Sequence, residues 1–368
     1  MTCKFYDISD IKNKFIMGRT FPEKSPLPLF FQNSGVELNC DGSELWIDVE
    51  TDHDINEPWI AYEINGAIIG RQMVLKGQHS ICLYRSMVPG VVKNVRVYRE
   101  TQAINGDYTL KLLVKGFRTD GNFLPVEPKK YKIEFIGDSI TSGEGTYGAL
   151  PDTEWLDMYA SSSRQYVNMI EKSMNADCHV VSHGGFGVYI SWDNNRNNNI
   201  PDHYERVCGT AKGEIHRELG TQKDWNFTSW QPDAIVINLG TNDGTSFDQP
   251  GLMVEGFGYC KMRREEDGSY NREDIDSIEK GIVDFLKMLR KHNPKAHLVW
   301  AYGMLGYVMK PYIIEAINNY KLETNDTIVN YLDLPETTPE TIGSHGHPGL
   351  KDQEKAAEVI ENYLRGIL

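Results

Sequence analysis

The sequence predicts two domains of different class, an N-terminal β-sandwich and a C-terminal α/β domain with a five-stranded, mainly parallel sheet. Three observations lead to this prediction. The length of 368 residues fits about two domains. Short alternating apolar runs recur before residue 125, and strand-like runs alternate with helical patterns after residue 130. We therefore expect a sandwich domain over residues 1–126 and an α/β domain over residues 127–368.

The first domain is predicted from period-two runs separated by turn signals, because alternation is typical of strands with one buried face. These runs are Gly35–Leu38, Leu45–Val49, Trp59–Ile64 and Val95–Tyr98, with turn pairs at Asp41-Gly42, Asn65-Gly66, Pro89-Gly90 and Asn105-Gly106. No long helical period occurs in this half. Pro125 and Pro128 then indicate a stiff linker, since proline fixes φ and resists helix.

The second domain is predicted from apolar runs that suit strands covered on both faces. They are Lys132–Ile136, Cys178–Ser182, Ala234–Asn238, Leu298–Tyr302 and Ile328–Leu332. Helical periodicity is clearest over Asp274–His292 and returns over Lys351–Leu364. Ligands of such sheets bind beyond the carboxyl ends of the strands, so the residues that follow each strand are the candidates for function.

Composition excludes several classes of function. With 38 Lys plus Arg against 52 Asp plus Glu, the net charge of −14 disfavours nucleic-acid binding. No apolar stretch approaches the roughly 20 residues that span a membrane. The N-terminus lacks an apolar core and a cleavage site, and the six cysteines form no Cys-x-x-Cys pair. We therefore expect a cytoplasmic protein with reduced thiols and no membrane or nucleic-acid partner.

The first chemical motif is Gly137-Asp138-Ser139, at the end of the first α/β strand. A serine there presents its hydroxyl at the sheet edge and its backbone N–H at a helix N-terminus, where an oxyanion is stabilised. The alternative is that Asp138 or Ser139 only caps the following helix.

Two further motifs offer oxyanion donors. Gly185 follows the second strand, and its backbone N–H could approach a ligand closely, although a tight turn explains the glycines equally well. Asn242 follows the third strand and offers uncharged amide donors, with Asp243 either holding it or capping the next segment. An ordinary Asn-Asp-Gly turn is the alternative reading of that motif.

The fourth motif, before the last helix, contains His345 and His347. A histidine is the natural base for a serine hydroxyl near neutral pH. His345 is the lesser alternative as base, and His183 is a secondary candidate near the glycine motif. A metal is not expected, because no Asp, Glu or Cys stands at ligand spacing from the two histidines. Together the motifs predict acyl transfer by Ser139, with His347 as base and the backbone N–H groups of Ser139 and Gly185 and the amide of Asn242 as oxyanion donors.

At these residues the sequence resembles the SGNH (GDSL-like) hydrolase superfamily. Gly137–Ile140, Gly185, Gly240–Asp243 and His347-Pro348 resemble its four blocks. The two-domain layout and the run from Trp230 to Asp243 are similar to carbohydrate esterase family two. The resemblance implies a jelly-roll-like sandwich followed by a three-layer α/β/α SGNH domain. It also implies a metal-free serine esterase that removes acetyl groups from sugars such as acetylxylan.

One position departs from the superfamily pattern. The superfamily usually has Asp three residues before the histidine, where this chain has Ser344. Some family members are described as using a Ser–His dyad with a backbone carbonyl that orients the histidine. We expect that arrangement here, with the carbonyl in Ser344–Gly346. If a carboxylate fills the role instead, those nearest in the chain are Asp333, Glu336 and Glu340.

The expected substrate is an acetylated sugar or oligosaccharide, without a cofactor. Sugars stack on aromatic faces, and Trp300 and Tyr302 end the fourth strand near the predicted cleft. The sandwich could bind glycan, shape the cleft or form a homo-oligomer contact. Two other functions remain open: a lipase or thioesterase of the same superfamily, which would need a long apolar channel, and a non-catalytic glycan-binding protein.

Overall fold

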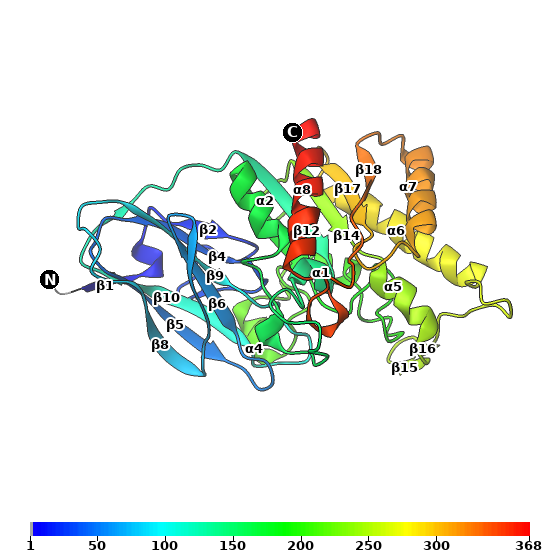
Figure 1. The fold of residues 1–368 in the computed structure, drawn as a ribbon, viewed down its shortest axis with the longest axis horizontal. Helices are drawn as coiled ribbons and strands as arrows, with labels where there is room; N and C mark the ends of the chain where they lie inside the picture. Colours follow the sequence, from blue (N-terminus) through cyan, green and yellow to red (C-terminus); the bar gives the residue numbers. More distant parts are fainter. Residues whose placement is uncertain (1–2) are drawn as a thin grey trace.

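The computed structural model describes residues 3–368 and has two parts that lie side by side (Figure 1). A β-sandwich forms one end of the molecule, and a sheet flanked by helices forms the other. The last strand of the sandwich, β11, ends at Leu124, and the first strand of the parallel sheet, β12, begins at Tyr131. The expected boundary at residues 126/127 lies in the passage between these two strands.

The sandwich consists of two antiparallel sheets. The first has the strand order β1-β10-β5-β8, with β3 paired to β10; the strands are β1 (Lys4–Asp7), β3 (Leu27–Pro28), β5 (Leu45–Asp52), β8 (Gly77–Tyr84) and β10 (Lys111–Thr119). The second has the order β11-β4-β9-β6-β7, with β2 paired to β4; the strands are β2 (Phe15–Met17), β4 (Gly35–Cys40), β6 (Trp59–Ile64), β7 (Ala67–Met73), β9 (Lys93–Arg99) and β11 (Phe123–Leu124).

The inward side chains of the two sheets form one core, which confirms the predicted sandwich. Buried apolar residues come from β4 and β9 of one sheet and from β5 and β10 of the other, for example Val36, Val97, Ile47 and Val114. The Asn65-Gly66 pair forms the β6–β7 turn with φ of 50° and 82°. Both values are positive, as a two-residue hairpin turn requires, so the choice of Asn and Gly fixes this register.

The second part is built on a five-stranded sheet in which every strand pairing is parallel. Its order is β13-β12-β14-β17-β18, with β12 (Tyr131–Gly137), β13 (Ala176–Ser182), β14 (Ala234–Asn238), β17 (His297–Tyr302) and β18 (Val329–Asp333). All five strands were predicted, within two residues at each end. A small hairpin, β15 (Leu252–Val254) and β16 (Gly258–Cys260), projects from this part.

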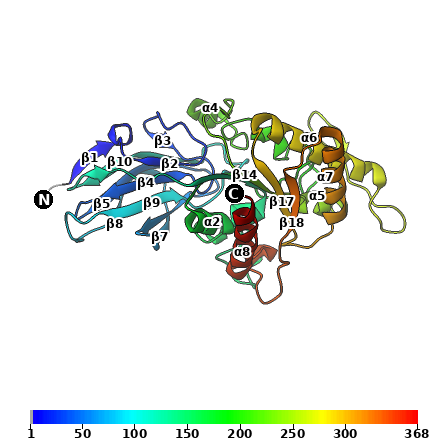
Figure 2. The same cartoon turned by 90° about the horizontal axis from the view of Figure 1, so that it is seen from above.

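Helices cover both faces of this sheet and give the predicted three layers (Figure 2). One face packs on α2 (Tyr166–Met174) and α8 (Leu350–Ile367), and the other packs on α6 (Arg272–His292) and α7 (Lys310–Thr324). Helix α6 begins two residues before the prediction because Asn271 caps it, accepting a hydrogen bond from the Asp274 N–H. The shorter helices are α1 (Ser139–Ser142), α3 (Pro201–Tyr204), α4 (Glu214–Leu219) and α5 (Thr241–Thr245).

The two parts share buried contacts. Phe30 and Phe31 of the sandwich part belong to the same apolar core as α6 and α7. The buried Arg19 guanidinium pairs with the Glu134 carboxylate of β12 at 2.8 Å. The sandwich is therefore packed against the parallel sheet and is in a position to contribute residues to a site there.

Two further sequence expectations concern the whole chain. All six cysteines are free thiols. Over residues 3–368, no helix has the length and apolar character that crossing a bilayer requires.

Candidate active site

Ser139 is the first residue of α1, directly after β12. The Asp138 side chain caps this turn by accepting the Ile140 N–H at 3.0 Å, and Gly143 ends it with φ of +74°. A side chain at Gly137 would meet the Thr141 hydroxyl at 1.9 Å, so the strand can enter so tight a turn only with glycine there. These constraints hold the nearly buried Ser139 hydroxyl at the carboxyl edge of the sheet.

His347 lies against this hydroxyl. Its Nε2 is 2.8 Å from Ser139 Oγ, although the two residues are 208 positions apart in the chain. Its Nδ1 is 2.8 Å from the His345 carbonyl oxygen, which can only accept, so Nδ1 carries the proton and Nε2 is free to accept from the serine. The geometry is that of a nucleophile and its base, with the base oriented by a backbone carbonyl as expected.

The residues weighed as alternatives do not reach this imidazole. Among residues 3–368, the buried Ser344 hydroxyl has no hydrogen-bond partner. Asp333 pairs with Lys310 instead, and Glu336 and Glu340 are exposed. His345 lies over His347 with its ring at 5.4 Å, and its carbonyl rather than its side chain serves the site. Its left-handed backbone, with φ of 53°, turns that carbonyl toward Nδ1.

Gly185 presents a free backbone donor. Its φ is +79°, and within residues 3–368 its N–H has no hydrogen-bond partner. The next carbonyl, that of Phe186, accepts a hydrogen bond from Asn242 Nδ2 at 2.9 Å. The glycine and asparagine motifs are therefore in direct contact at the same edge of the sheet.

The amide of Asn242 is not free in the structure. Besides Phe186, its Nδ2 faces Asp138 Oδ2 at 3.2 Å, so both amide protons point at protein acceptors. An acyl oxygen would have to compete with the longer of these two bonds. Asp243 does not hold Asn242: its carboxylate accepts the N–H groups of Val188, Tyr189 and Ile190 and fixes the loop after the glycine motif.

Buried carboxyl groups surround the serine. Burial raises the pKa of Asp138 from 3.8 to about 8, and the nearby carboxylates of Glu144 and Asp243 raise it further, against the opposing hydrogen bond from Ile140. Burial also raises the pKa of Asp243. The site therefore carries less negative charge at neutral pH than its residue types suggest.

Glu144 and Gln102 were not predicted from the sequence. Glu144 is buried, with Oε2 at 3.6 Å from His347 Nε2, and its Oε1 accepts from Gln102 Nε2 at 2.6 Å. Gln102 lies between β9 and β10 of the sandwich part. A carboxylate within the small-residue run after Ser139 was the available signal for Glu144, but local sequence carries no sign of Gln102.

Three predicted or secondary candidates are ruled out by their positions. Trp300 and Tyr302 are 0% and 2% exposed, because side chains of a strand covered on both faces pack under helices, so neither can stack on a sugar. His183 uses both ring nitrogens for the backbone of Gly184 and Asn105. Burial lowers the pKa of His183 to about 4.

Trp192 is an exposed aromatic residue next to the glycine motif. Its indole is 47% exposed, and its backbone N–H donates to the Gly185 carbonyl at 3.1 Å. A side chain built on Gly185 would meet the indole at 2.9 Å. The indole therefore flanks the glycine motif and presents about half of its surface to solvent.

Glu144, His345 and His347 bring possible metal-ligand atoms within 4.8 Å of one another. However, His347 Nε2 already contacts Ser139, His347 Nδ1 the His345 carbonyl, and Glu144 Oε1 Gln102. Binding a cation through His347 would break the contact between base and nucleophile. The donor set is therefore a poor fit for a resident metal.

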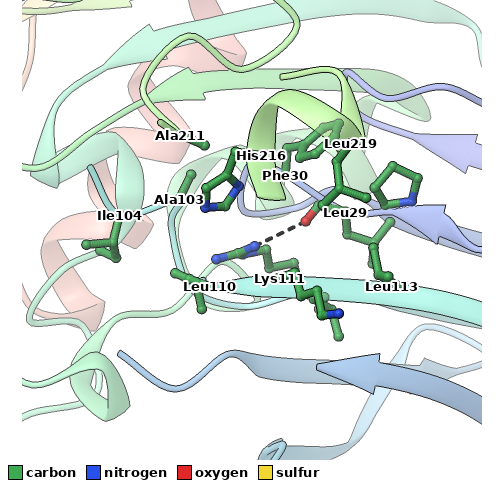
Figure 3. Close-up of a pocket in the computed structure, with 13 residues that line it drawn as sticks. Leu29, Phe30, Ala103, Ile104, Leu110, Lys111, Leu113, Ala211, His216 and Leu219 are labelled. Atoms are coloured by element: carbon green, nitrogen blue, oxygen red, sulfur yellow. Dashed lines mark hydrogen bonds between the residues drawn. The ribbon is translucent and has the colours of Figure 1, made fainter. Parts of the chain in front are cut away.

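Two small hollows lie at different places in the fold relative to the candidate site residues, and only one of them is lined by residues of the histidine motif. A cavity between the sandwich and α4, lined by Leu29, Ala103, Leu110, His216 and Leu219 among others, has no residue of the four motifs in its lining (Figure 3). Its free volume of about 10 Å³ is at the limit for one water molecule. A second small hollow, lined by Glu144, Trp155, Tyr159 and His345, adjoins the imidazole pair.

Comparison with known proteins extends this picture. The family profile of GDSL-like lipase/acylhydrolases matches residues 133–360. The structure of an acetyl xylan esterase, Est2A, from the rumen bacterium Butyrivibrio proteoclasticus is 52% identical, with a TM-score of 0.98 over 100% of this chain and 98% of that one. A family two carbohydrate esterase from Clostridium thermocellum in complex with cellohexaose shares the fold, with 20% identity and a TM-score of 0.78 over 96% and 98% of the two chains.

Curated relatives include further carbohydrate esterases. An acetylxylan esterase / glucomannan deacetylase of Cellvibrio japonicus is 30% identical over 76% of this chain and 71% of its own length. The cellulase/esterase CelE of Acetivibrio thermocellus is 22% identical over 92% of this chain. The chain spans 37% of CelE and 51% of a further C. japonicus relative of the same description. From the profile match over 133–360 and the identity to Est2A along its whole length, the chain belongs to the GDSL-like lipase/acylhydrolase family, in the two-part form that family two carbohydrate esterases share.

Proposed function

We propose that this chain is a serine esterase that removes acetyl groups from acetylated carbohydrates such as acetylxylan. The observation that carries the proposal is the 2.8 Å contact between Ser139 Oγ and His347 Nε2 at the edge of the sheet. The 52% identity to an acetyl xylan esterase supports the substrate class. The reaction follows from the geometry without a cofactor.

In the first half of the reaction, Ser139 attacks the acetyl carbonyl while His347 Nε2 takes its proton. The His345 carbonyl holds Nδ1–H, so the imidazole keeps the tautomer that can accept. His347 then returns the proton to the leaving sugar hydroxyl, which leaves an acetyl ester on Ser139. Water, activated by the same imidazole, hydrolyses that ester and restores the enzyme.

Negative charge on the acyl oxygen needs donors in both halves of the reaction. We assign the backbone N–H groups of Ser139 and Gly185 and the side-chain amide of Asn242 to this role. The Gly185 N–H has no other partner in the described chain, and Asn242 would exchange its 3.2 Å bond to Asp138 for one to the oxyanion. Each such donor typically contributes about 2.7–4 kcal/mol of barrier lowering.

We expect a short acyl group, because the chain is 52% identical over its whole length to an acetyl xylan esterase. A fatty acyl chain would need a long apolar channel instead. The similarity favours an acetyl esterase over a lipase or thioesterase.

Trp192 is the platform we propose for the sugar. Its half-exposed indole adjoins Gly185, so a pyranose stacked on it would carry its ester to the oxyanion donors. Trp192→Ala should raise KM for an acetylated xylo-oligosaccharide about tenfold and leave kcat for 4-nitrophenyl acetate unchanged. An unchanged KM for the oligosaccharide would show that Trp192 does not bind the sugar.

The test of the proposal is acetate release from acetylated xylo-oligosaccharide by the wild-type chain and by Ser139→Ala. The wild type should release acetate, and the variant should be inactive but folded. Acetyl and octanoyl nitrophenyl esters, compared in parallel, should favour acetyl. Preference for octanoyl would indicate a lipase, and glycan binding without turnover by the wild type would indicate a binding protein.

A further inference from the structure

We infer that Gln102 of the sandwich part is a positioning residue of the esterase site, because it holds the Glu144 carboxylate beside the base. This inference rests on the proposed function. It assigns a role in catalysis to the sandwich and identifies a negative charge that compensates for Ser344 at the position where the superfamily usually has Asp.

The carboxamide of Gln102 connects two motifs at once. Its Oε1 accepts the Gly184 N–H at 2.7 Å, and its Nε2 donates to Glu144 Oε1 at 2.6 Å. The side chain is buried, with 2% of its surface exposed, so these bonds do not compete with bulk water. One side chain from the sandwich thus fixes both the residue before Gly185 and the carboxylate behind Ser139.

Glu144 has its other oxygen turned toward the base. Oε2 lies 3.6 Å from His347 Nε2, which is longer than a hydrogen bond but well within the range of a charge interaction. The Glu144 N–H also donates to the Ser139 carbonyl at 3.0 Å, so the nucleophile's own turn anchors the residue. When Nε2 takes the serine proton, the new positive charge forms beside this carboxylate.

Gly184 leaves the space that Glu144 occupies. A Cβ at residue 184 would lie 2.0 Å from Glu144 Oε1 and 3.1 Å from Gln102 Nε2. Its φ is outside the left-handed region, so the backbone itself would accept a side chain. The glycine is therefore required by the carboxylate and not by the turn.

Several other titratable groups face this cluster, among them Glu154 and Tyr159 in the hollow beside Glu144. Asp138 and Asp157 both have their pKa raised, chiefly by burial, with Glu144 adding to the effect, and Asp243 acts on Asp138. The His345 ring is stacked on His347 from the solvent side. Variants at Gln102 and Glu144 leave these groups in place, but Glu144→Gln also removes a charge that raises the pKa of Asp138 and Asp157, so titration of the His347 ring itself is needed to assign the change to the imidazole.

The experiment measures kcat and KM for 4-nitrophenyl acetate from pH 4.5 to 9 in wild type, Glu144→Gln and Gln102→Met. Loss of the negative charge disfavours the protonated imidazole. The acidic limb of the kcat/KM profile should therefore move to lower pH in Glu144→Gln. Maximal kcat should fall at least about tenfold with KM nearly unchanged. In Gln102→Met the acidic limb should move in the same direction by a smaller amount.

The matched control is Asn168→Ala in α2. Asn168 is also buried and bonds across to the sandwich, through Asn33 Oδ1 at 3.3 Å, but it contacts none of the site residues. Asn168→Ala should lower the stability of the protein and keep the same pH profile as the wild type. If Asn168→Ala moves the acidic limb of the pH profile as far as Gln102→Met does, loosened packing between the two parts explains the effect and the inference is wrong.

A second readout does not depend on turnover. The ring resonances of His347, identified by their loss in His347→Gln, are titrated by NMR in wild type and Glu144→Gln. The inference predicts a lower midpoint in the variant, and equal midpoints would overturn it. A wild type that hydrolyses no acetyl ester would instead refute the proposed function, while the titration would still decide whether Glu144 acts on the imidazole.

Discussion

Replacing Asn242 by Ala tests the assignment of the oxyanion donors most sharply. The substitution removes an amide whose two protons point at the Phe186 carbonyl and at Asp138. In the transition state one of these protons is expected to bond to the acyl oxygen instead. Losing one oxyanion donor costs about 2.7–4 kcal/mol, which is roughly a 100- to 1,000-fold fall in kcat.

The same substitution also affects folding. It leaves the buried Phe186 carbonyl without its donor, which costs about 1–3 kcal/mol of unfolding free energy. The matched control is Asn238→Ala at the end of β14, where a buried asparagine likewise donates to a backbone carbonyl, that of Ala301, at 2.8 Å. The two variants should lose similar stability, and only the first should lose activity.

The assay combines initial rates on 4-nitrophenyl acetate with urea unfolding of both variants. Asn242→Ala should keep KM within a few-fold while kcat falls. If kcat stays within tenfold of the wild type, or if Asn238→Ala loses as much activity, Asn242 is a structural residue and the oxyanion is held by backbone donors alone.

Three other predictions follow from the surroundings of the serine. Ser344→Ala should retain most activity, because the Ser344 hydroxyl has no partner in the part of the chain that the structure describes; a loss near that of His347→Ala in steady-state rates would contradict the backbone-carbonyl dyad. Gly184→Ala should lower kcat about as much as Gln102→Met, because its Cβ would displace Glu144; wild-type kinetics in this variant would show that the carboxylate position is unimportant. Burial raises the pKa of Asp138 to about 8, so the stability it contributes is complete below its ordinary value of 3.8 and is lost as pH rises through 8. Because the amide of Asp138→Asn cannot ionise, the unfolding free energy of the wild type, measured by urea titration between these limits, should fall relative to that of the variant as pH rises, and a constant difference would refute this.

The sequence was informative wherever one physical constraint acts locally. The five parallel strands were predictable because burial on both faces requires continuous apolar runs, and their order along the chain placed Ser139, Gly185, Asn242 and His347 at one edge. The carbonyl at Nδ1 was expected from the resemblance to family two carbohydrate esterases, since Ser344 cannot supply the charge of the usual Asp. The turn at Asn65-Gly66 was predictable because few residues accept positive φ in succession.

What could not be predicted depends on contacts between distant segments. Trp300 aligns with Ile237 in the sheet and packs beneath helices, so its place at the end of an apolar run did not show which way its side chain points. Gln102 and Glu144 are separated by 42 positions and meet only because the sandwich packs against the sheet. No local pattern distinguishes such a pair from surface residues.

The central claim is that Ser139 is a nucleophile activated by His347, and covalent labelling tests it most directly. The chain is treated with a serine-directed phosphonate, and the modified peptide is located by mass spectrometry in wild type and His347→Ala. The account predicts a single adduct on Ser139, formed at least about 100-fold more slowly without the imidazole. An unlabelled wild type, an adduct on another serine, or equal labelling rates in the two proteins would contradict it.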